Sequence, residues 1–420
     1  MGSQEPSAAA PRKRSAGLGP WGPQAGASTS GARAAGAQGP APINDVIVVG
    51  AGIVGAACAA ACARRGLRVL VLDGAGIGGG ATAAGMGHLV VMDDSEAQFS
   101  LTRYSQQLWQ QLEPELPPDV EYTPSGTIWV AADEEEMAEV RHKHAFYGAR
   151  GVATEILDAA SLARLEPNLR PGLAGGLLVP GDAVIYPPCA ARFLLQRAAG
   201  APGIEVRLGA RVVAIGQGRV RLADGAEYAA GVVVNAAGAA AVVLSPGLPI
   251  RGRKGHLVIT DRYPGWVRHQ LVELGYLKSA HAHDADSVAF NVQPRATGQV
   301  LIGSSRQFHA ADGAVDHAML ARMLRRAQEY MPSLAALSAL RTWTGFRAAT
   351  PDSLPLIGLS PDDPTVFLAT GHEGLGITTS LGTGQLVADQ IVGEQTAIPA
   401  QPYFPNRFNR SDGLPDAPHH

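Results

Sequence analysis

The chain has 420 residues, of which 46% are hydrophobic and 17% charged, so it is long enough to bury the cores of two packed domains. Its formal net charge of −3 gives no electrostatic basis for binding nucleic acids or anionic membranes. It contains no apolar run of about 18 residues or more, which excludes an ordinary membrane-spanning helix.

The first 43 residues differ in composition from the rest of the chain. Thirty of them are Ala, Gly, Pro or Ser, and the segment carries several basic residues but a single acid, Glu5. Such a segment cannot bury enough apolar surface to offset the entropy of the chain, so we expect residues 1–43 to form a disordered leader. No hydrophobic stretch follows its basic cluster, which excludes a secretory signal. Its Arg-bearing, acid-poor composition leaves a transit-like role as the alternative.

Residues 45–74 form a recognisable unit of strand, turn, helix and strand. The apolar runs Asp45–Val49 and Leu67–Leu72 predict strands, and Ala56–Arg65 predicts a helix of small residues. Gly66 stands where a helix C-cap glycine is expected. This order of elements is typical of a dinucleotide-binding βαβ unit.

The turn of this unit carries the chemistry. Gly50, Gly52 and Gly55 form a G-x-G-x-x-G motif. The first glycine permits the tight turn, the second lets the backbone approach a pyrophosphate, and the third lets helix and strand pack closely. The N–H groups at the helix N-terminus favour phosphate, and Asp73 at the end of the second strand can accept hydrogen bonds from an adenosine ribose. An acid at this position disfavours NADP, which leaves FAD or NAD.

The next segment favours FAD. Gly74–Leu89, GAGIGGGATAAGMGHL, is a second loop of glycine and small residues. An NAD enzyme has no need of such a loop directly after the second strand, whereas a flavoenzyme needs backbone alongside the pyrophosphate and the isoalloxazine ring. The candidate FAD-binding residues of this half are Gly50, Gly52, Ile53, Val54, Gly55, Asp73, Gly74, Gly80, Ala81, Thr82, Ala84, Gly85, Met86 and Gly87.

The remaining pattern predicts helices and strands in two interleaved domains. Helices are expected at Asp94–Leu112, Glu134–Gly148, Leu157–Leu165, Cys189–Ala199 and Val315–Met331. Strands are expected at Gly126–Ala132, Glu205–Ile215, Val220–Leu222, Arg253–Thr260, Ser287–Val292, Gln299–Gly303 and Trp343–Ala349. The expected fold is α/β, with a Rossmann-like FAD-binding domain (44–125, 182–262 and 341–408) interleaved with an α+β substrate domain (126–181 and 263–340) built on a mixed or antiparallel sheet.

Three later segments of the chain resemble those of a known family. They are VVVNAAG at Val232–Gly238, GFRAATPDSLPLIG at Gly345–Gly358 and ATGHEGLGITTSLGTG at Ala369–Gly384. From Ile43 to Phe408 the chain resembles the D-amino-acid oxidase superfamily of FAD-dependent oxidoreductases, which includes glycine oxidase, sarcosine oxidase and D-amino-acid dehydrogenase. The sequence GHEGLGITTSLGTGQLVADQI, Gly371–Ile391, is most similar to the β-type subunits of D-hydroxyproline dehydrogenase. The resemblance implies further FAD contacts at Val213, Ala236, Ala237, Gly238, Arg347, Gly371, His372, Gly374, Leu375, Gly376, Ile377 and Thr378.

The expected chemistry requires a carboxylate anchor. A flavin takes two electrons as a hydride from a carbon beside nitrogen or oxygen, so the protein must mainly hold the substrate and neutralise its charge. Arginine matches a carboxylate bidentately, and Arg347 lies where related glycine oxidases and D-amino-acid dehydrogenases place a carboxylate-binding arginine. The proline that usually follows it in the family is Ala348 here. The other candidates for the catalytic site are His88, His256, Asn291 and Tyr276.

Two further expectations concern the flavin itself. Backbone N–H groups of Gly374–Thr378, at the N-terminus of the following helix, are expected to stabilise negative charge on the reduced ring. Some sarcosine oxidases tether FAD through a cysteine in the C-terminal half, but no cysteine follows Cys189, so we expect non-covalent FAD. Cys58 and Cys62, four residues apart on the first helix, are interpreted as small core residues, and no metal site is predicted.

The sequence therefore predicts an FAD-dependent amino-acid dehydrogenase or oxidase that acts on the C–N bond of a small amino acid. The favoured substrate is a cyclic imino acid of the D-proline or D-hydroxyproline type. The alternatives are a glycine- or sarcosine-type oxidase using O2, an FAD-dependent 2-hydroxy-acid dehydrogenase, and a non-catalytic FAD-binding subunit. A dehydrogenase would pass electrons to an acceptor or to an iron–sulfur subunit, because this chain has no cysteine cluster of its own. We expect a cytoplasmic location, with peripheral association with the inner membrane as the alternative.

Overall fold

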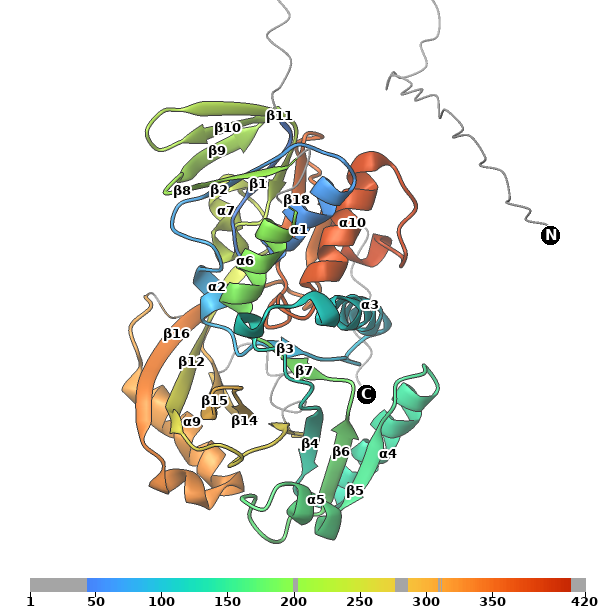
Figure 1. The fold of residues 1–420 in the computed structure, drawn as a ribbon, viewed down its shortest axis with the longest axis vertical. Coiled ribbons are helices and arrows are strands. Elements are labelled where there is room, and N and C mark those ends of the chain that lie inside the picture. The colour runs from blue at the N-terminus through green and yellow to red at the C-terminus, as the bar shows by residue number, and fades with distance from the viewer. Residues whose placement is uncertain (1–43, 199–202, 276–285, 309, 311, 409–420) are drawn as a thin grey trace, which may run out of the picture. The chain divides into compact units, whose positions relative to one another are not determined.

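A computed structural model describes residues 44–198, 203–275, 286–308, 310 and 312–408. These residues form two eight-stranded sheets and one small two-stranded sheet, β3 (His88–Leu89) with β7 (Ala183–Val184) (Figure 1). The leader and Tyr276 lie outside the described residues. None of the described helices is long and apolar enough to cross a membrane.

The first sheet is the dinucleotide-binding sheet. Its strand order is β17-β18-β11-β1-β2-β8, with β10 pairing β11 and β9. The strands are β1 (Asn44–Val49), β2 (Val69–Asp73), β8 (Ile204–Leu208), β9 (Val212–Gly216), β10 (Arg219–Leu222), β11 (Glu227–Asn235), β17 (Leu356–Leu359) and β18 (Val366–Thr370). β1 is parallel to β2 and β11, β2 to β8, and β11 to β18. The runs of Val, Ile and Leu in β1 and β2 are buried, as parallel strands covered on both faces require.

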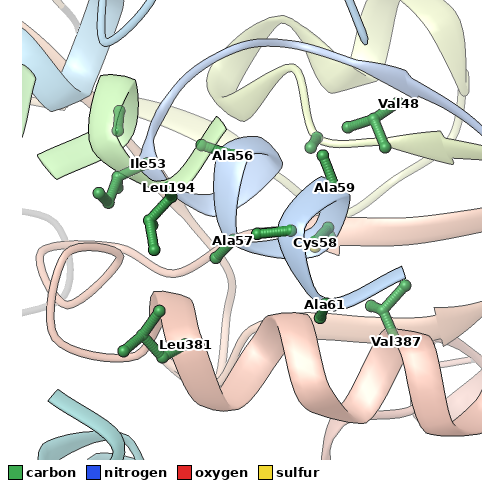
Figure 2. Packing of buried hydrophobic residues seen from close by; sticks show 14 of the residues in the cluster. Val48, Ile53, Ala56, Ala57, Cys58, Ala59, Ala61, Leu194, Leu381 and Val387 are labelled. Carbon is green, nitrogen blue, oxygen red and sulfur yellow. The ribbon is translucent and has the colours of Figure 1, made fainter. Parts of the chain in front are cut away.

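Small residues let three helices pack closely beside this sheet. They are α1 (Ile53–Arg64), α6 (Pro187–Arg197) and α10 (Ser380–Val392), and Figure 2 shows α1 lying between side chains of the other two. A Cβ added at Gly384 of α10 would lie 2.5 Å from the carbonyl oxygen of Ala57 in α1. Cys58 and Cys62 are fully buried in this core, which confirms their interpretation as packing residues.

The second sheet has the order β16-β12-β15-β14-β13-β4-β6-β5. Its strands are β4 (Thr127–Ala131), β5 (Glu155–Asp158), β6 (Gly175–Val179), β12 (Arg251–Arg262), β13 (Gln270–Glu273), β14 (Ser287–Pro294), β15 (Gln299–Arg306) and β16 (Ala339–Ala349). β13 and β4 are parallel and the other neighbours are antiparallel, so the sheet is mixed. Together with the first sheet, this confirms the expected fold class.

Further helices cover the second sheet or connect the two sheets. α9 (His317–Tyr330) packs against β14 and β15, while α4 (Glu134–Gly148) and α5 (Ala159–Leu165) pack against β6. The other α-helices in the described part of the chain are α2 (Gly80–Ala83), α3 (Glu96–Leu112) and α7 (Ala241–Leu244). Short 3-10 helices occur at Glu113–Glu115, Pro118–Val120, Gly238–Ala240, Pro332–Ala336, Gln401–Tyr403 and Pro405–Phe408.

Several expected boundaries are wrong for identifiable reasons. The single strand expected at Glu205–Ile215 is two strands, β8 and β9, because Gly209 adopts a left-handed φ of 69° between them. The segment expected as the helix Leu157–Leu165 begins in strand β5, and the helix starts after Asp158, whose side chain accepts a hydrogen bond from Ser161 N. α6 begins at Pro187 instead of Cys189, since proline suits the first turn of a helix.

The division into two domains stays a proposal, with one adjustment. β12 and most of β16 fell in segments expected to belong to the FAD-binding domain, yet both strands pair within the second sheet. We therefore propose that the boundary between the FAD-binding and substrate domains follows these two long strands.

A buried acid near the junction of the sheets gives a test of the structure by pH. Asp182 is 1% exposed, and its Oδ1 accepts hydrogen bonds from Gln106 Nε2 at 2.7 Å and from Val91 N at 3.2 Å. Burial raises the pKa of Asp182 from 3.8 to about 7. Between these two values the folded protein holds a proton that the unfolded chain releases, so the free energy of unfolding should fall as pH rises from about 4 to about 7.

Asp182→Asn should remove this pH-dependent fall in the free energy of unfolding. The variant should be more stable than the wild type at pH 8, by on the order of 3 kcal/mol, and the difference should vanish near pH 4. Denaturant unfolding at a series of pH values measures it, with Asp362→Asn, an exposed substitution, as the control. A stability difference that does not change with pH would contradict the assignment.

Candidate functional site

The glycine-rich turn between β1 and α1 leaves no room for side chains. Gly50 has a φ of 111°, and a Cβ there would lie 2.6 Å from the carbonyl oxygen of Ala236, in the loop after β11. A Cβ at Gly55 would lie 2.0 Å from the carbonyl oxygen of Gly50. Backbone therefore lines this turn, as a cradle for a pyrophosphate requires.

Hydrogen bonds fix both ends of the cradle. The Asp73 carboxylate accepts from Ala51 N at 2.8 Å and from Ala75 N at 2.7 Å, which sets its position at the end of β2. At the start of α1, Ile53 N donates to Thr82 Oγ1 at 3.0 Å. The next amides of the first helical turn have no intrahelical acceptor, so they remain suited to phosphate oxygens.

The second glycine-rich loop contacts the two later segments that resemble the family. A Cβ at Gly85 would lie 2.6 Å from Ile377 Cδ1, in the turn before α10, and a Cβ at Gly345 of β16 would lie 2.4 Å from Ala84 Cβ. The structure thus brings together FAD-binding candidates from three distant parts of the chain.

The FAD-binding candidates near the expected adenosine end of the cofactor lie after β2, in β9 and after β11 of the first sheet. A Cβ at Gly74 would lie 3.4 Å from Arg211 Cα, so the segment leading into β9 runs beside the end of β2. Val213 lies in β9 and is 39% exposed. Gly238, after β11, accepts a hydrogen bond at its carbonyl oxygen from Thr370 Oγ1 at 2.9 Å, which joins this loop to the end of β18.

Arg347 lies where the second sheet meets the turn before α10. It stands on β16 directly opposite Arg253 of β12, and its Nη1 donates to Ser305 O at 3.0 Å. Its guanidinium lies over Gly255, where a Cβ would be 2.7 Å from Nη1, and its stem passes Gly374. Because glycine has no side chain, these two positions leave space for the arginine.

Sequence reasoning missed the acid beside this arginine. Glu373 is 14% exposed, and its carboxylate accepts from Arg253 Nη1 and from Gly374 N, each at 2.7 Å. Burial alone would raise the pKa of Glu373, but the guanidinium groups of Arg306, Arg347 and Arg253 outweigh it and lower the pKa. The one available signal was an acid inside the glycine-rich GHEGLG segment, where Glu373 adopts a left-handed φ of 51°.

The backbone N–H groups of Gly374–Thr378, which were expected at the N-terminus of a helix, are arranged differently. Gly374 N–H donates to Glu373, and α10 begins at Ser380, preceded by a turn in which Thr379 N donates to Leu375 O at 2.9 Å. Gly374–Thr378 therefore precede the helix instead of forming its N-terminus. The flavin contacts assigned to these residues remain a proposal.

Two histidines in these loops have lowered pKa values. Burial of the ring lowers the pKa of His88 to about 4, an interaction with the Gln293 side chain opposes this shift, and the charge of Arg347 adds to it. His88 Nε2 is buried without a hydrogen-bond partner among the described residues. Burial lowers the pKa of His372 to about 3, and its Nε2 lies 2.9 Å from Thr383 Oγ1. His88 is thus able to hydrogen-bond a ligand, while His372 ties the turn to α10.

His256 has both ring nitrogens engaged within the protein. Asp316 N donates to its Nε2 at 3.0 Å, which leaves Nδ1 as the protonated nitrogen that donates to Ser305 Oγ at 2.9 Å. This arrangement connects β12, β15 and the start of α9. We propose that His256 supports the sheet, and a direct catalytic part for it remains an untested prediction.

The strand β14 presents unpartnered polar atoms near the second glycine-rich loop. Asn291 pairs with Gly303 across the sheet, and a Cβ at Gly303 would lie 3.0 Å from Met86 Sδ. Gln293 Nε2 donates to Met86 O at 2.7 Å. The side-chain oxygens of Asn291 and Gln293 are buried and have no partner among the described residues. Such atoms are costly to leave unpaired, so they are suited to N–H or O–H donors of a flavin or a substrate.

Comparison with known proteins shows the family to which this chain is similar. The family model DAO, described as FAD dependent oxidoreductase, matches residues 45–390. Glycine oxidase of Geobacillus kaustophilus is 29% identical over 292 residues, covering 68% of this chain and 74% of that protein. Hydrogen cyanide synthase subunit HcnC of Pseudomonas aeruginosa is 28% identical over 325 residues, covering 74% of each chain.

A solved structure shows the same similarity in three dimensions. The crystal structure of glycine oxidase from Geobacillus kaustophilus superposes with a TM-score of 0.77 at 27% identity, covering 87% of this chain and 98% of that one. The glycine cradle, the acid at the end of β2 and the orphaned polar atoms all suit the cofactor that the family uses. This chain therefore belongs to the DAO family of FAD-dependent oxidoreductases.

Proposed function

We propose that this enzyme oxidises the C–N bond of a small amino acid and that Arg347 binds the substrate carboxylate. FAD, when bound, accepts the two electrons that leave the substrate carbon. The observation that supports the proposal most is the position of Arg347, whose guanidinium lies at the meeting point of the second sheet and the turn before α10. The glycine oxidase relative favours an amino acid over a hydroxy acid.

The residues of the site support binding and orientation. Nη1 of Arg347 donates to Ser305 O, and we propose that Nε and Nη2 pair with the substrate carboxylate in a bidentate manner. His88 is neutral, so it can hydrogen-bond the substrate or cofactor without adding charge. We propose that the residues of the glycine-rich turn, the second glycine-rich loop and the turn before α10 hold FAD.

Within this class we favour a cyclic imino acid of the D-proline or D-hydroxyproline type, oxidised by a dehydrogenase. The support is the resemblance of the sequence Gly371–Ile391 to that subfamily. A glycine- or sarcosine-type oxidase using O2 is the second candidate. An electron-accepting partner, including an iron–sulfur subunit, belongs to the dehydrogenase proposal.

Anaerobic bleaching of the flavin tests the substrate class. The holoenzyme is mixed with D-proline, D-hydroxyproline, glycine, sarcosine, D-alanine and 2-hydroxy acids, and the flavin absorbance is followed. We expect reduction by amino or imino acids and none by hydroxy acids. The rates at which O2 and an artificial electron acceptor reoxidise the reduced flavin are then compared. Fast reoxidation by O2 indicates an oxidase, and fast reoxidation by the artificial acceptor alone indicates a dehydrogenase. Bleaching by hydroxy acids alone would overturn the C–N proposal.

The attachment of the cofactor can be tested separately. Because no cysteine follows Cys189, acid or heat treatment should release all FAD into the supernatant. Absorbance of the supernatant and of the resolubilised pellet measures this release. Flavin that stays with the precipitated protein would show a covalent link.

A further inference from the structure

A second arginine lies beside the proposed carboxylate anchor. Arg253 of β12 and Arg347 of β16 are direct partners in the antiparallel ladder, so their side chains leave the same face of the sheet. Arg253 is 8% exposed, and the ring of Phe308 lies 4.3 Å from its guanidinium carbon. The two arginine side chains therefore lie on the same face of the sheet, the face on which Arg347 is proposed to bind the substrate.

The hydrogen bonds of Arg253 are incomplete. Its Nη1 donates to Glu373 Oε1 at 2.7 Å, but its Nε is buried and has no acceptor among the described residues. Nε and Nη2 form one edge of the planar guanidinium fork, and that edge suits a hydroxyl or carboxylate oxygen. A buried charged donor without an acceptor is costly, so an acceptor supplied by a ligand would complete the site.

We infer that Arg253 binds a second oxygen of the amino-acid substrate, at the end of the molecule away from the carboxylate held by Arg347. The inference rests on the proposed function, since it places the substrate carboxylate on Arg347. It narrows the substrate class to small amino or imino acids that carry a hydroxyl or a second carboxylate. Glu373 acts here as a positioning residue, because it holds Nη1 of Arg253 and so sets the direction of the Nε edge.

Matched substrate pairs test this inference on the holoenzyme. D-4-hydroxyproline is compared with D-proline, which lacks the hydroxyl, and iminodiacetate with sarcosine, which lacks the second carboxylate. We expect kcat/KM to favour the oxygen-bearing member of at least one pair by about 10-fold or more, as for a hydrogen bond to a charged group. The pair that shows the preference identifies the oxygen as a hydroxyl or a carboxylate.

Variants show whether Arg253 causes the preference. The double variant Arg253→Met with Glu373→Gln removes the cation and its partner acid together, and its preference should fall to about 1. Glu373→Gln alone keeps Arg253 and should retain part of the preference. Since each ratio compares two substrates on one protein, a general loss of activity cancels, and the flavin spectrum confirms that FAD is bound.

The outcomes separate this inference from the proposed function. Flavin reduction by amino acids without preference in either wild-type pair overturns the inference alone. A wild-type preference that survives in the double variant also overturns it. Failure of every amino acid to reduce the flavin overturns the proposed function and the inference together.

Discussion

Replacing Arg347 by lysine should lower kcat/KM for the amino-acid substrate by about 10- to 100-fold while FAD stays bound. Lysine keeps the charge but loses the planar fork, and one hydrogen bond to a charged group is worth about 1.5–3 kcal/mol. Arg347→Ala should cost more, because it also removes the charge. Steady-state kinetics with the best substrate of the bleaching panel measures both effects.

The control for this experiment lies on the same strand. Arg341 of β16 is exposed and contacts the Trp343 ring, so Arg341→Lys should leave kcat/KM unchanged. An amine without a carboxylate should respond far less to Arg347→Lys than the amino acid does. Normal turnover of the amino acid by both Arg347 variants would place the anchor elsewhere, and loss of FAD would make Arg347 a cofactor or structural residue.

Gly55→Ala should abolish FAD binding or prevent folding. The added Cβ would lie 2.0 Å from the carbonyl oxygen of Gly50, and backbone cannot move aside as a flexible side chain can. Separation of α1 from β1 would cost about 3 kcal/mol or more and would widen the pyrophosphate cradle. Flavin absorbance per chain and thermal unfolding measure the two effects.

Gly148→Ala is the matched control for this substitution. Gly148 is the exposed last residue of α4, outside the proposed FAD site, and a Cβ there would meet no atom within 4 Å. The variant should bind FAD and unfold as the wild type does. A Gly55→Ala protein with full flavin content would show that the cradle tolerates a side chain and would remove the main structural reason for the motif.

The parts of the fold that were predictable depend on local chemistry. The G-x-G-x-x-G turn and Asp73 lie within one βαβ unit, and α4 begins and ends where its pattern predicts, at Glu134 and Gly148. What the pattern of α4 did not show is that Lys143 is 1% exposed, paired with Asp93 and 4.8 Å from the Trp129 ring. From the sequence alone, a lysine on a charged helix is expected to face solvent. Lys143 is buried because residues far from it in the sequence pack around it.

The candidate site shows the same limit. Arg347 could be proposed from a local motif, and its part in the site stays a prediction, whereas the pair of Arg253 and Glu373 joins residues 120 positions apart. Their contact depends on the register of β12 against β16 and on the path of the turn after β18, and neither has a local signal. The role of Asp182 is likewise set by burial, which a single acid in a loop does not reveal.

The contact between Gly345 and Ala84 has a consequence for the order of assembly. Strand β16 carries Arg347, the proposed anchor of the substrate, and two residues earlier in the same strand its backbone touches the loop expected to follow the flavin. On the other side, the carbonyl oxygen of Ala348 accepts a backbone hydrogen bond from Glu373 N at 2.8 Å. If these segments hold FAD as proposed, they also set the position of Arg347, so we expect FAD to bind first and substrate selectivity to develop only in the loaded protein.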